Sequence, residues 1–115
     1  MIKGRHKYGA QRTEVDGITF HSKKEAKRYQ ELKLLELAGE IHSLTLQPRF
    51  QLSAKRQCDP VGRGIELGHY VGDFSYYDKR LHNSVVEDVK GFRTPLYRWK
   101  KKHVEAQYGI TIREV

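Results

Sequence analysis

Cysteines and long apolar segments are almost absent from this sequence. Cys58 is the single cysteine among 115 residues, so an internal disulfide and a zinc site built from several thiolates are both excluded. The longest apolar runs are of about two residues, and we therefore expect no membrane-spanning segment. The first residues, Met1 to Arg5, include no apolar stretch, so we expect no secretory signal and a cytoplasmic location.

Two basic stretches of the chain, residues 1–12 and residues 93–102, contain no acidic residue. Overall, 22 Lys and Arg against 14 Asp and Glu give a formal net charge of +8. Such an excess on a chain of one domain's length indicates a polyanionic partner, and nucleic acid is the first candidate. The cations of the two acid-free stretches are Lys3, Arg5, Lys7, Arg12, Arg93, Arg98, Lys100, Lys101 and Lys102.

Two interpretations fit the basic N-terminal arm, residues 1–12. It is either a disordered terminus or a segment that lies along phosphates. In the second stretch Thr94 and Pro95 are expected to begin a helix, and helix N-termini also favour phosphates. Of the aromatic residues there, Tyr97 and Trp99, we expect one in the core and the other free to stack on a base or fill a dimer interface. The predicted DNA contacts are Lys3, Arg5, Lys7, Arg93, Thr94, Arg98 and Lys100.

Residues 13–115 are predicted to form one domain, since roughly 100–150 residues suit a single core. Asp16-Gly17, flanked by β-branched and aromatic residues, predicts a tight hairpin. Ser22 followed by Glu25 indicates a capping box that begins a helix running to about residue 38. A second helix is predicted over 94–108, and strands are predicted over 44–52, 69–77, 85–90 and 110–115.

The order hairpin-α-β-β-β-α-β predicts an α/β (α+β) domain with a mixed central sheet flanked by helices. The strand, helix, strand unit at the C-terminal end implies one parallel pair. Pro48 interrupts the first long strand, so we expect an edge strand or a bulge there. Residues 53–68 are predicted to be a long loop, and three roles stay open for it: a clamp on DNA, a dimer element or a disordered insertion.

Acidic residues interrupt two of the predicted strands. Asp73 lies among aromatic and aliphatic residues, and Asp88 lies near the end of a Val-rich strand, two residues before Lys90. If the two strands pair as a hairpin, Asp73 lies beside Asp88, and their mutual repulsion favours a divalent cation such as Mg²⁺, or Mn²⁺ in its place. A one-residue shift in register would present Glu87 instead, but only Asp88 has the i, i+2 relation to Lys90.

Glu25 is a third candidate acid. It lies on the same helical stripe as Tyr29 and Leu32, so we expect it to face the sheet. Two interpretations remain open for its carboxylate, because the residue at this position of a capping box also serves the helix N-terminus.

Together these residues resemble a known nuclease superfamily. Asp73 followed by Asp88-Val89-Lys90 resembles the PD-(D/E)XK signature, although Gly72 stands where the motif's name has proline. An upstream acid, here Glu25, is similar to the pattern of archaeal-type Holliday junction resolvases and related transposon-end nucleases. A small phage-encoded family of this superfamily is similar over nearly the whole chain, in Lys7–Ala10, Asp16–Phe20, Ser22–Ala26, Leu46–Pro48 and Asp88–Gly91.

The resemblance implies a restriction-endonuclease-like core and metal-dependent hydrolysis of DNA, leaving 5′-phosphate and 3′-hydroxyl ends. Asp73, Asp88 and the Val89 carbonyl would hold Mg²⁺, with Glu25 helping directly or through water. Lys90 would orient the attacking water or stabilise charge on the phosphate. It also implies a phage enzyme acting in the cytoplasm of an infected cell, and symmetric cutting of branched DNA would need a homodimer.

Several alternatives to a junction resolvase stay open at this stage. Within enzymes, the alternative is a nicking, single-strand or transposon-end-type nuclease. From a different class, the alternative is a non-catalytic nucleic-acid-binding module with the same fold. A ribonuclease or RNA-binding protein is a third. The set Asp73, Asp88 and Lys90 argues against a pure binding module, because clustered acids repel a polyanion.

Overall fold

The computed structural model describes residues 11–59, 61–89 and 93–115. The described residues form two helices and eight strands: β1 Thr13–Val15, β2 Ile18–Phe20, α1 Lys23–Leu37, β3 Ile41–Leu46, β4 Arg49–Ala54, β5 Ile65–Val71, β6 Phe74–Asp78, β7 Asn83–Asp88, α2 Pro95–Tyr108 and β8 Thr111–Glu114. Neither described helix has the length and apolar character needed to cross a bilayer.

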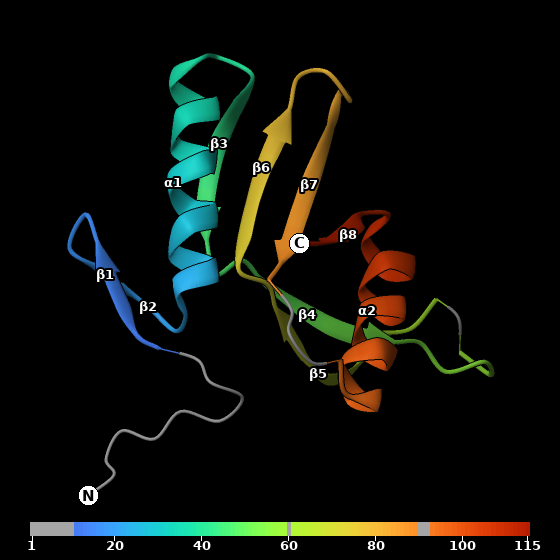
Figure 1. The fold of residues 1–115 in the computed structure, drawn as a ribbon. Coiled ribbons are helices and arrows are strands. Elements are labelled where there is room, and N and C mark those ends of the chain that lie inside the picture. Colours follow the sequence, from blue (N-terminus) through green and yellow to red (C-terminus); the bar gives the residue numbers. More distant parts are fainter. Residues whose placement is uncertain (1–10, 60, 90–92) are drawn as a thin grey trace, which may run out of the picture.

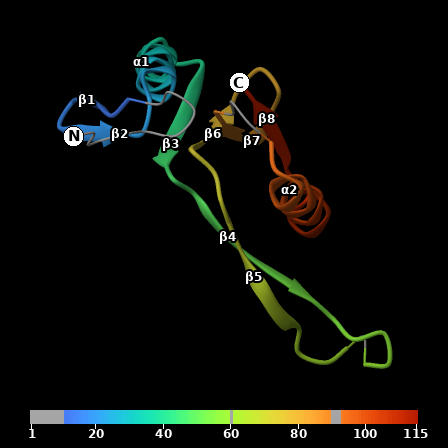
Figure 2. The ribbon, with the colours of Figure 1, turned by 60° about the horizontal axis from the view of Figure 1, so that its bottom comes forward.

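A four-stranded mixed sheet forms the centre of the fold, in the order β3-β6-β7-β8 (Figure 1). The pairs β3–β6 and β6–β7 are antiparallel, and β7–β8 is parallel, as the βαβ pattern predicts. α1 covers one face of the sheet and α2 the other (Figures 1 and 2). The predicted fold class, an α+β domain with a mixed sheet flanked by helices, is therefore confirmed.

Two hydrophobic clusters lie on opposite faces of this sheet. On the α1 side Leu32 and Phe74 are fully buried in a cluster that includes Val85. On the α2 side Val104 is fully buried in a cluster that includes Val86. The neighbouring residues Val85 and Val86 thus belong to different clusters, because successive side chains of a strand point to opposite faces. The same alternation fixes where the acids at the end of β7 lie.

The local turn and capping signals act as the sequence predicts. Asp16 and Gly17 have positive φ angles of 54° and 76°, which is the geometry of a type I′ turn. Ser22 caps α1 by accepting a hydrogen bond from the Glu25 N–H at 3.1 Å. Thr94 caps α2 in the same way through the Tyr97 N–H, and Gly109 ends that helix with a φ of 66°.

Three predictions about the middle of the chain are wrong in their bounds. The strand predicted over 44–52 is two strands, because the chain turns at Gln47, which has a φ of 51°, and at Pro48. The strand predicted over 69–77 is also two, divided at Gly72 and Asp73. The predicted loop 53–68 is shorter than expected, because β4 runs to Ala54 and β5 begins at Ile65. These two strands pair along their length and extend away from the sheet as a ribbon (Figure 2).

Gly72 lies where the chain passes from this ribbon into the central sheet, in close contact with β7. A Cβ atom added there would stand 2.8 Å from the Val86 Cγ1 atom and 3.4 Å from the Glu87 carbonyl oxygen. Both neighbours belong to the buried strand, so neither has room to move. This close approach accounts for a glycine at position 72.

We expect Gly72→Ala to lower the free energy of unfolding by about 1–3 kcal/mol, because it overpacks the interior beside Val86. Gly64→Ala is the matched control: its Cβ would meet nothing closer than 3.5 Å, so we expect a change within about 0.5 kcal/mol. Urea unfolding of the two variants measures both values. Equal stability of the two variants would contradict this packing argument.

Candidate active site

Asp73 and Asp88 meet at one end of the central sheet. β6 and β7 pair with Phe74 opposite Glu87, which places the preceding Asp73 beside the last residue of β7, Asp88. The Asp73 N–H donates to the Glu87 carbonyl at 2.9 Å, and its Oδ2 accepts from the Val89 N–H at 2.7 Å. The backbone of β7 thus fixes the Asp73 carboxyl against Asp88, as the hairpin pattern predicts.

The electrostatic state of Asp73 reflects this crowding. Burial, with the neighbouring Glu25 and Asp88 carboxylates, raises the pKa of Asp73 to about 7, although the bond from the Val89 N–H lowers it. In its protonated form Asp73 also donates a hydrogen bond to Asp88. Near neutral pH Asp73 is therefore protonated in part of the molecules, and a cation is the other means of relieving the repulsion.

Glu25 reaches the same region from the N-terminus of α1. It is 6% exposed, and it accepts the His21 N–H at 3.1 Å while its own N–H donates to the Ser22 hydroxyl at 3.1 Å. It also lines a hollow of about 190 Å³ together with Asp73 and Gln47. The two interpretations of Glu25 are thus compatible, since one carboxylate serves the helix N-terminus and faces Asp73.

Asp88 faces the α2 side, where two tyrosines approach it. The Tyr70 hydroxyl, from β5, donates a short hydrogen bond to the Asp88 Oδ2 atom. Burial and this bond raise the pKa of Tyr70 far above its ordinary value, so the phenol stays a donor. Asp88 also lines a hollow of about 210 Å³ with Tyr70, Thr94, Tyr97 and Lys100. Sequence reasoning missed Tyr70, and only its position three residues before Asp73 hints at a role.

Glu87 faces the α1 side and is neutralised there. Its carboxylate, fully buried, accepts bonds of 2.7 and 2.6 Å from Nε and Nη2 of Arg28 on α1. The Tyr76 hydroxyl donates a further short bond, and Arg113 lies 3.9 Å away. Glu87 is therefore occupied by a structural ion pair, whereas Asp88 is the acid beside Asp73. This is the strand register that was predicted from the i, i+2 relation of Asp88 to Lys90.

The predicted DNA contacts are divided among several environments. Arg93 pairs with Glu114 at 2.7 Å, Arg98 is exposed, and Thr94 and Lys100 line the hollow beside Asp88. Lys3, Arg5 and Lys7 lie outside the described residues, and so does Lys90.

Tyr97 and Trp99, the aromatic residues of the basic stretch 93–102, separate as predicted. Tyr97 is buried and Trp99 is half exposed.

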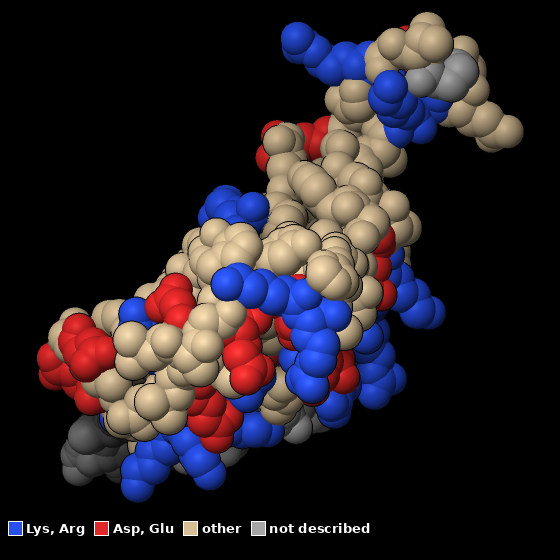
Figure 3. Space-filling view, turned by 90° about the horizontal axis from the view of Figure 1, so that it is seen from above, with Lys and Arg blue, Asp and Glu red and all other residues tan. Residues whose placement is uncertain are grey.

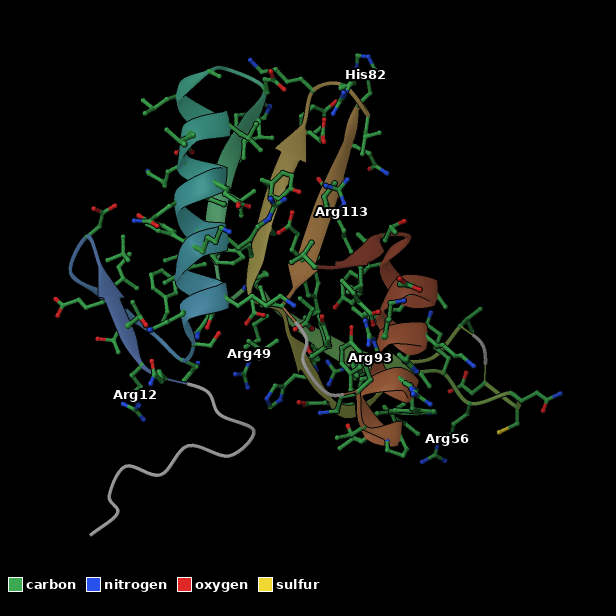
Figure 4. All side chains as sticks on the ribbon, viewed as in Figure 1. Arg12, Arg49, Arg56, His82, Arg93 and Arg113 are labelled. Atoms are coloured by element: carbon green, nitrogen blue, oxygen red, sulfur yellow. The ribbon has the colours of Figure 1, made fainter. Side chains whose placement is uncertain are left out.

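Several arginines lie at the carboxylate end of the molecule. Figure 4 places Arg12, Arg49 and Arg93 at the end of the molecule where β7 finishes, whereas His82 lies at the opposite end. Acids at the centre with cations around them are an arrangement that suits a phosphate and its metal.

The acids fit Mg²⁺ better than a metal that requires a complete protein cage. Among the described residues, no group of three or more His, Cys, Asp or Glu is arranged to hold a metal ion. Mg²⁺ usually takes only one or two carboxylates and completes its octahedron with water and substrate phosphates. Asp73 and Asp88 supply such a pair, held side by side where β6 begins and β7 ends.

The pKa of Asp73 predicts how stability depends on pH without metal. Because the folded-state pKa of about 7 exceeds the unfolded value of about 3.8, the native state binds an extra proton between these values, and stability falls as pH rises through them. We expect Asp73→Asn to abolish this fall and to be more stable than wild type at pH 8 by the order of 2 kcal/mol. Urea unfolding in chelator at pH 5 and pH 8 measures the difference.

Asp59→Asn removes an exposed carboxylate and is the control, for which we expect the wild-type pH profile. Adding Mg²⁺ at pH 8 is expected to stabilise wild type and to leave Asp73→Asn unchanged. Parallel pH profiles for wild type and Asp73→Asn would contradict the raised pKa of Asp73.

Comparison with known proteins yields one match. Residues 5–113 match the family described as "Protein of unknown function (DUF1064)". No curated protein and no solved structure matches the chain.

Proposed function

Because the chain belongs to the DUF1064 family, whose description names no activity, we propose its function from its site: it is a Mg²⁺-dependent DNA endonuclease. The observation that carries the proposal is the pairing of Asp73 and Asp88 at the end of two adjacent strands, with the Asp73 pKa raised to about 7. Two carboxylates held side by side repel each other in the metal-free protein, and binding a cation would relieve that repulsion.

The topology supports the same proposal. Without the β4–β5 ribbon, the order is β1–β2 hairpin, α1, β3, β6, β7, α2 and β8, which is the expected hairpin-α-β-β-β-α-β. Asp73 precedes the second of these central strands, and Asp88 ends the third. These are the places that the resemblance to PD-(D/E)XK nucleases assigns to the two acids of the motif.

Each residue of the site has a role in the proposed reaction. Asp73 and Asp88 would hold the metal, with Glu25 binding it directly or through water, and the Val89 carbonyl is a further proposed ligand. Bound Mg²⁺ supplies charge neutralisation at the phosphate and a more acidic water. Tyr70 fixes Asp88 by its hydrogen bond, and the Val89 N–H fixes Asp73. Lys90 is proposed to orient the attacking water and to stabilise charge on the phosphate.

The proposed substrate is branched DNA, cut as a four-way junction by a homodimer. The net charge of +8 favours a polyanion, and Arg12, Arg49 and Arg93 lie at the carboxylate end of the sheet (Figure 4). A junction has two equivalent cutting positions, so a pair of identical sites suits it. We therefore propose a structure-selective resolvase, and the basic segments at the start of the chain and on α2 as its phosphate contacts.

A panel of end-labelled nucleic acids tests this proposal. We expect Mg²⁺-dependent paired cuts on a four-way junction and no product from linear duplex, single strands or RNA. Cutting of single strands, or single nicks in duplex, would assign the chain to a different nuclease class. Binding to the panel without cleavage of any member would support a non-catalytic binding module and overturn the proposed activity.

A further inference from the structure

The ribbon formed by β4 and β5 contributes Tyr70 to the proposed active site and is anchored beside it. Tyr70, on β5, bonds to Asp88, and the Tyr108 hydroxyl of α2 donates to the Gln51 carbonyl on β4 at 2.7 Å. His103 and Gln107, also on α2, contact Ser53 at 2.9 and 3.1 Å. Bonds to Asp88 and to α2 thus hold the ribbon from Tyr70, near the sheet, to Ser53, next to the tip.

The tip of the ribbon, described over residues 55–59 and 61–64, is basic and largely exposed. Lys55, Arg56 and Arg63 are all exposed, and Asp59 is the one acid between them. Two tight turns order the described part of the tip: the Asp59 N–H donates to the Arg56 carbonyl, and the Gly62 N–H to the Asp59 carbonyl, both at 3.1 Å. Figure 3 shows Lys and Arg side chains gathered at this end of the ribbon, beyond a shaft with few charges.

We propose that the β4–β5 ribbon is a second DNA-binding surface, which contacts duplex phosphates with Arg56 and Arg63 at its tip. This proposal rests on the proposed function only for the choice of DNA as the polyanion. A two-stranded ribbon has the width to enter the major groove, where such ribbons bind in other proteins. The Tyr70–Asp88 bond then makes the ribbon a guide that sets the duplex relative to the active site.

The length of the ribbon indicates how far from the active site this contact lies. The five steps from Arg49 to Ala54 span about 17 Å at the usual strand rise. Because base pairs are spaced about 3.4 Å apart along the duplex axis, the tip would extend the contact by about five base pairs. The ribbon would therefore hold a duplex arm at some distance from the cleaved phosphate.

A second copy of the chain is the other occupant that the ribbon allows. Leu67 and Val71 are exposed on it, and apolar side chains of this kind favour a protein interface. The charge argues the other way, because tips carrying three cations and one acid would repel each other if they met. The exposed cations of the tip therefore favour DNA.

The test is equilibrium binding of a fluorescent duplex in chelator, with Arg56→Gln/Arg63→Gln as the variant. Two lost phosphate contacts should weaken binding about tenfold at low salt and reduce the slope of log Kd against log salt by about 2. Lys79→Gln/Arg80→Gln is the matched control, since it removes two exposed cations at the β6–β7 turn, beside His82 at the opposite end of Figure 4. The control should keep the affinity and the slope near those of wild type.

Wild-type affinity and salt slope in Arg56→Gln/Arg63→Gln would overturn the proposal. A second result would also overturn it. If the wild-type protein sediments as a dimer, Leu67→Ser sediments as a monomer and Arg56→Gln/Arg63→Gln binds DNA normally, the ribbon joins two copies of the chain. Chelator separates this test from the proposed function. If the double variant shows a reduced salt slope and the wild-type protein cleaves nothing, the ribbon proposal is supported and the nuclease proposal is contradicted. If the wild-type protein cleaves and the salt slope is unchanged, only the ribbon proposal is contradicted.

Discussion

Asp73→Asn and Asp88→Asn are each expected to reduce Mg²⁺-dependent cleavage by at least about 10³-fold, because a metal ligand contributes several kcal/mol of transition-state stabilisation. DNA binding is expected to stay equal or to become tighter, since each substitution removes a negative charge that faces a phosphate. Both replacements keep the shape of the side chain, and the amide that replaces the Asp73 carboxyl retains an oxygen that accepts the Val89 N–H. Single-turnover cleavage and equilibrium binding of the same junction measure the two effects.

Glu40→Gln provides the control for this experiment. Glu40 is an exposed acid between α1 and β3, so its loss changes the net charge by the same amount without touching the carboxylate pair. We expect cleavage by this variant at the wild-type rate. Loss of binding in Asp73→Asn or Asp88→Asn with an unchanged rate of bond cleavage would contradict the assignment of these acids as metal ligands.

Arg28→Met is expected to lower the free energy of unfolding by about 3 kcal/mol, because it leaves the fully buried Glu87 carboxylate without its bidentate partner. Tyr76 and Arg113 remain near Glu87 and reduce the loss of stability. The expected loss is therefore at the lower end of the range for breaking a buried ion pair. Urea unfolding at neutral pH measures it.

The double variant Arg28→Met/Glu87→Gln tests whether the loss comes from an uncompensated charge. It should recover at least half of the lost stability, since the amide that replaces the Glu87 carboxylate is neutral and still accepts from Tyr76. Glu31→Gln breaks only the exposed 3.0 Å pair with Arg28 and should cost at most about 0.5 kcal/mol. A double variant as unstable as Arg28→Met would indicate that lost packing of the Arg28 stem, and not charge, causes the effect.

The alternation along β7 explains why much of the site was predictable from sequence. Val85 and Glu87 point to the α1 face, and Val86 and Asp88 to the α2 face, as a strand requires. Hairpin pairing then places Asp73 beside Asp88, and the capping pattern orients Glu25. Each of these inferences depends on short-range rules of turns, caps and strands.

The parts that were missed depend on contacts between distant segments. β5 is exposed at most of its positions, so the apolar alternation that identifies a strand is absent, and residues 65–68 were predicted to be loop. The Tyr70–Asp88 and Arg28–Glu87 bonds join residues 18 and 59 positions apart. No local pattern specifies such partners, because they arise only when the ribbon and α1 pack against the sheet.

Restoring metal to a chelated reaction on a four-way junction tests the central claim most directly. With chelator the wild-type protein should bind the junction and leave it intact, and excess Mg²⁺ should then produce two symmetric cuts. Hydrolysis that leaves 5′-phosphate and 3′-hydroxyl ends predicts that DNA ligase seals the products. Cleavage that continues in chelator, or an intact junction after Mg²⁺ is restored, would contradict a Mg²⁺-dependent endonuclease centred on Asp73 and Asp88.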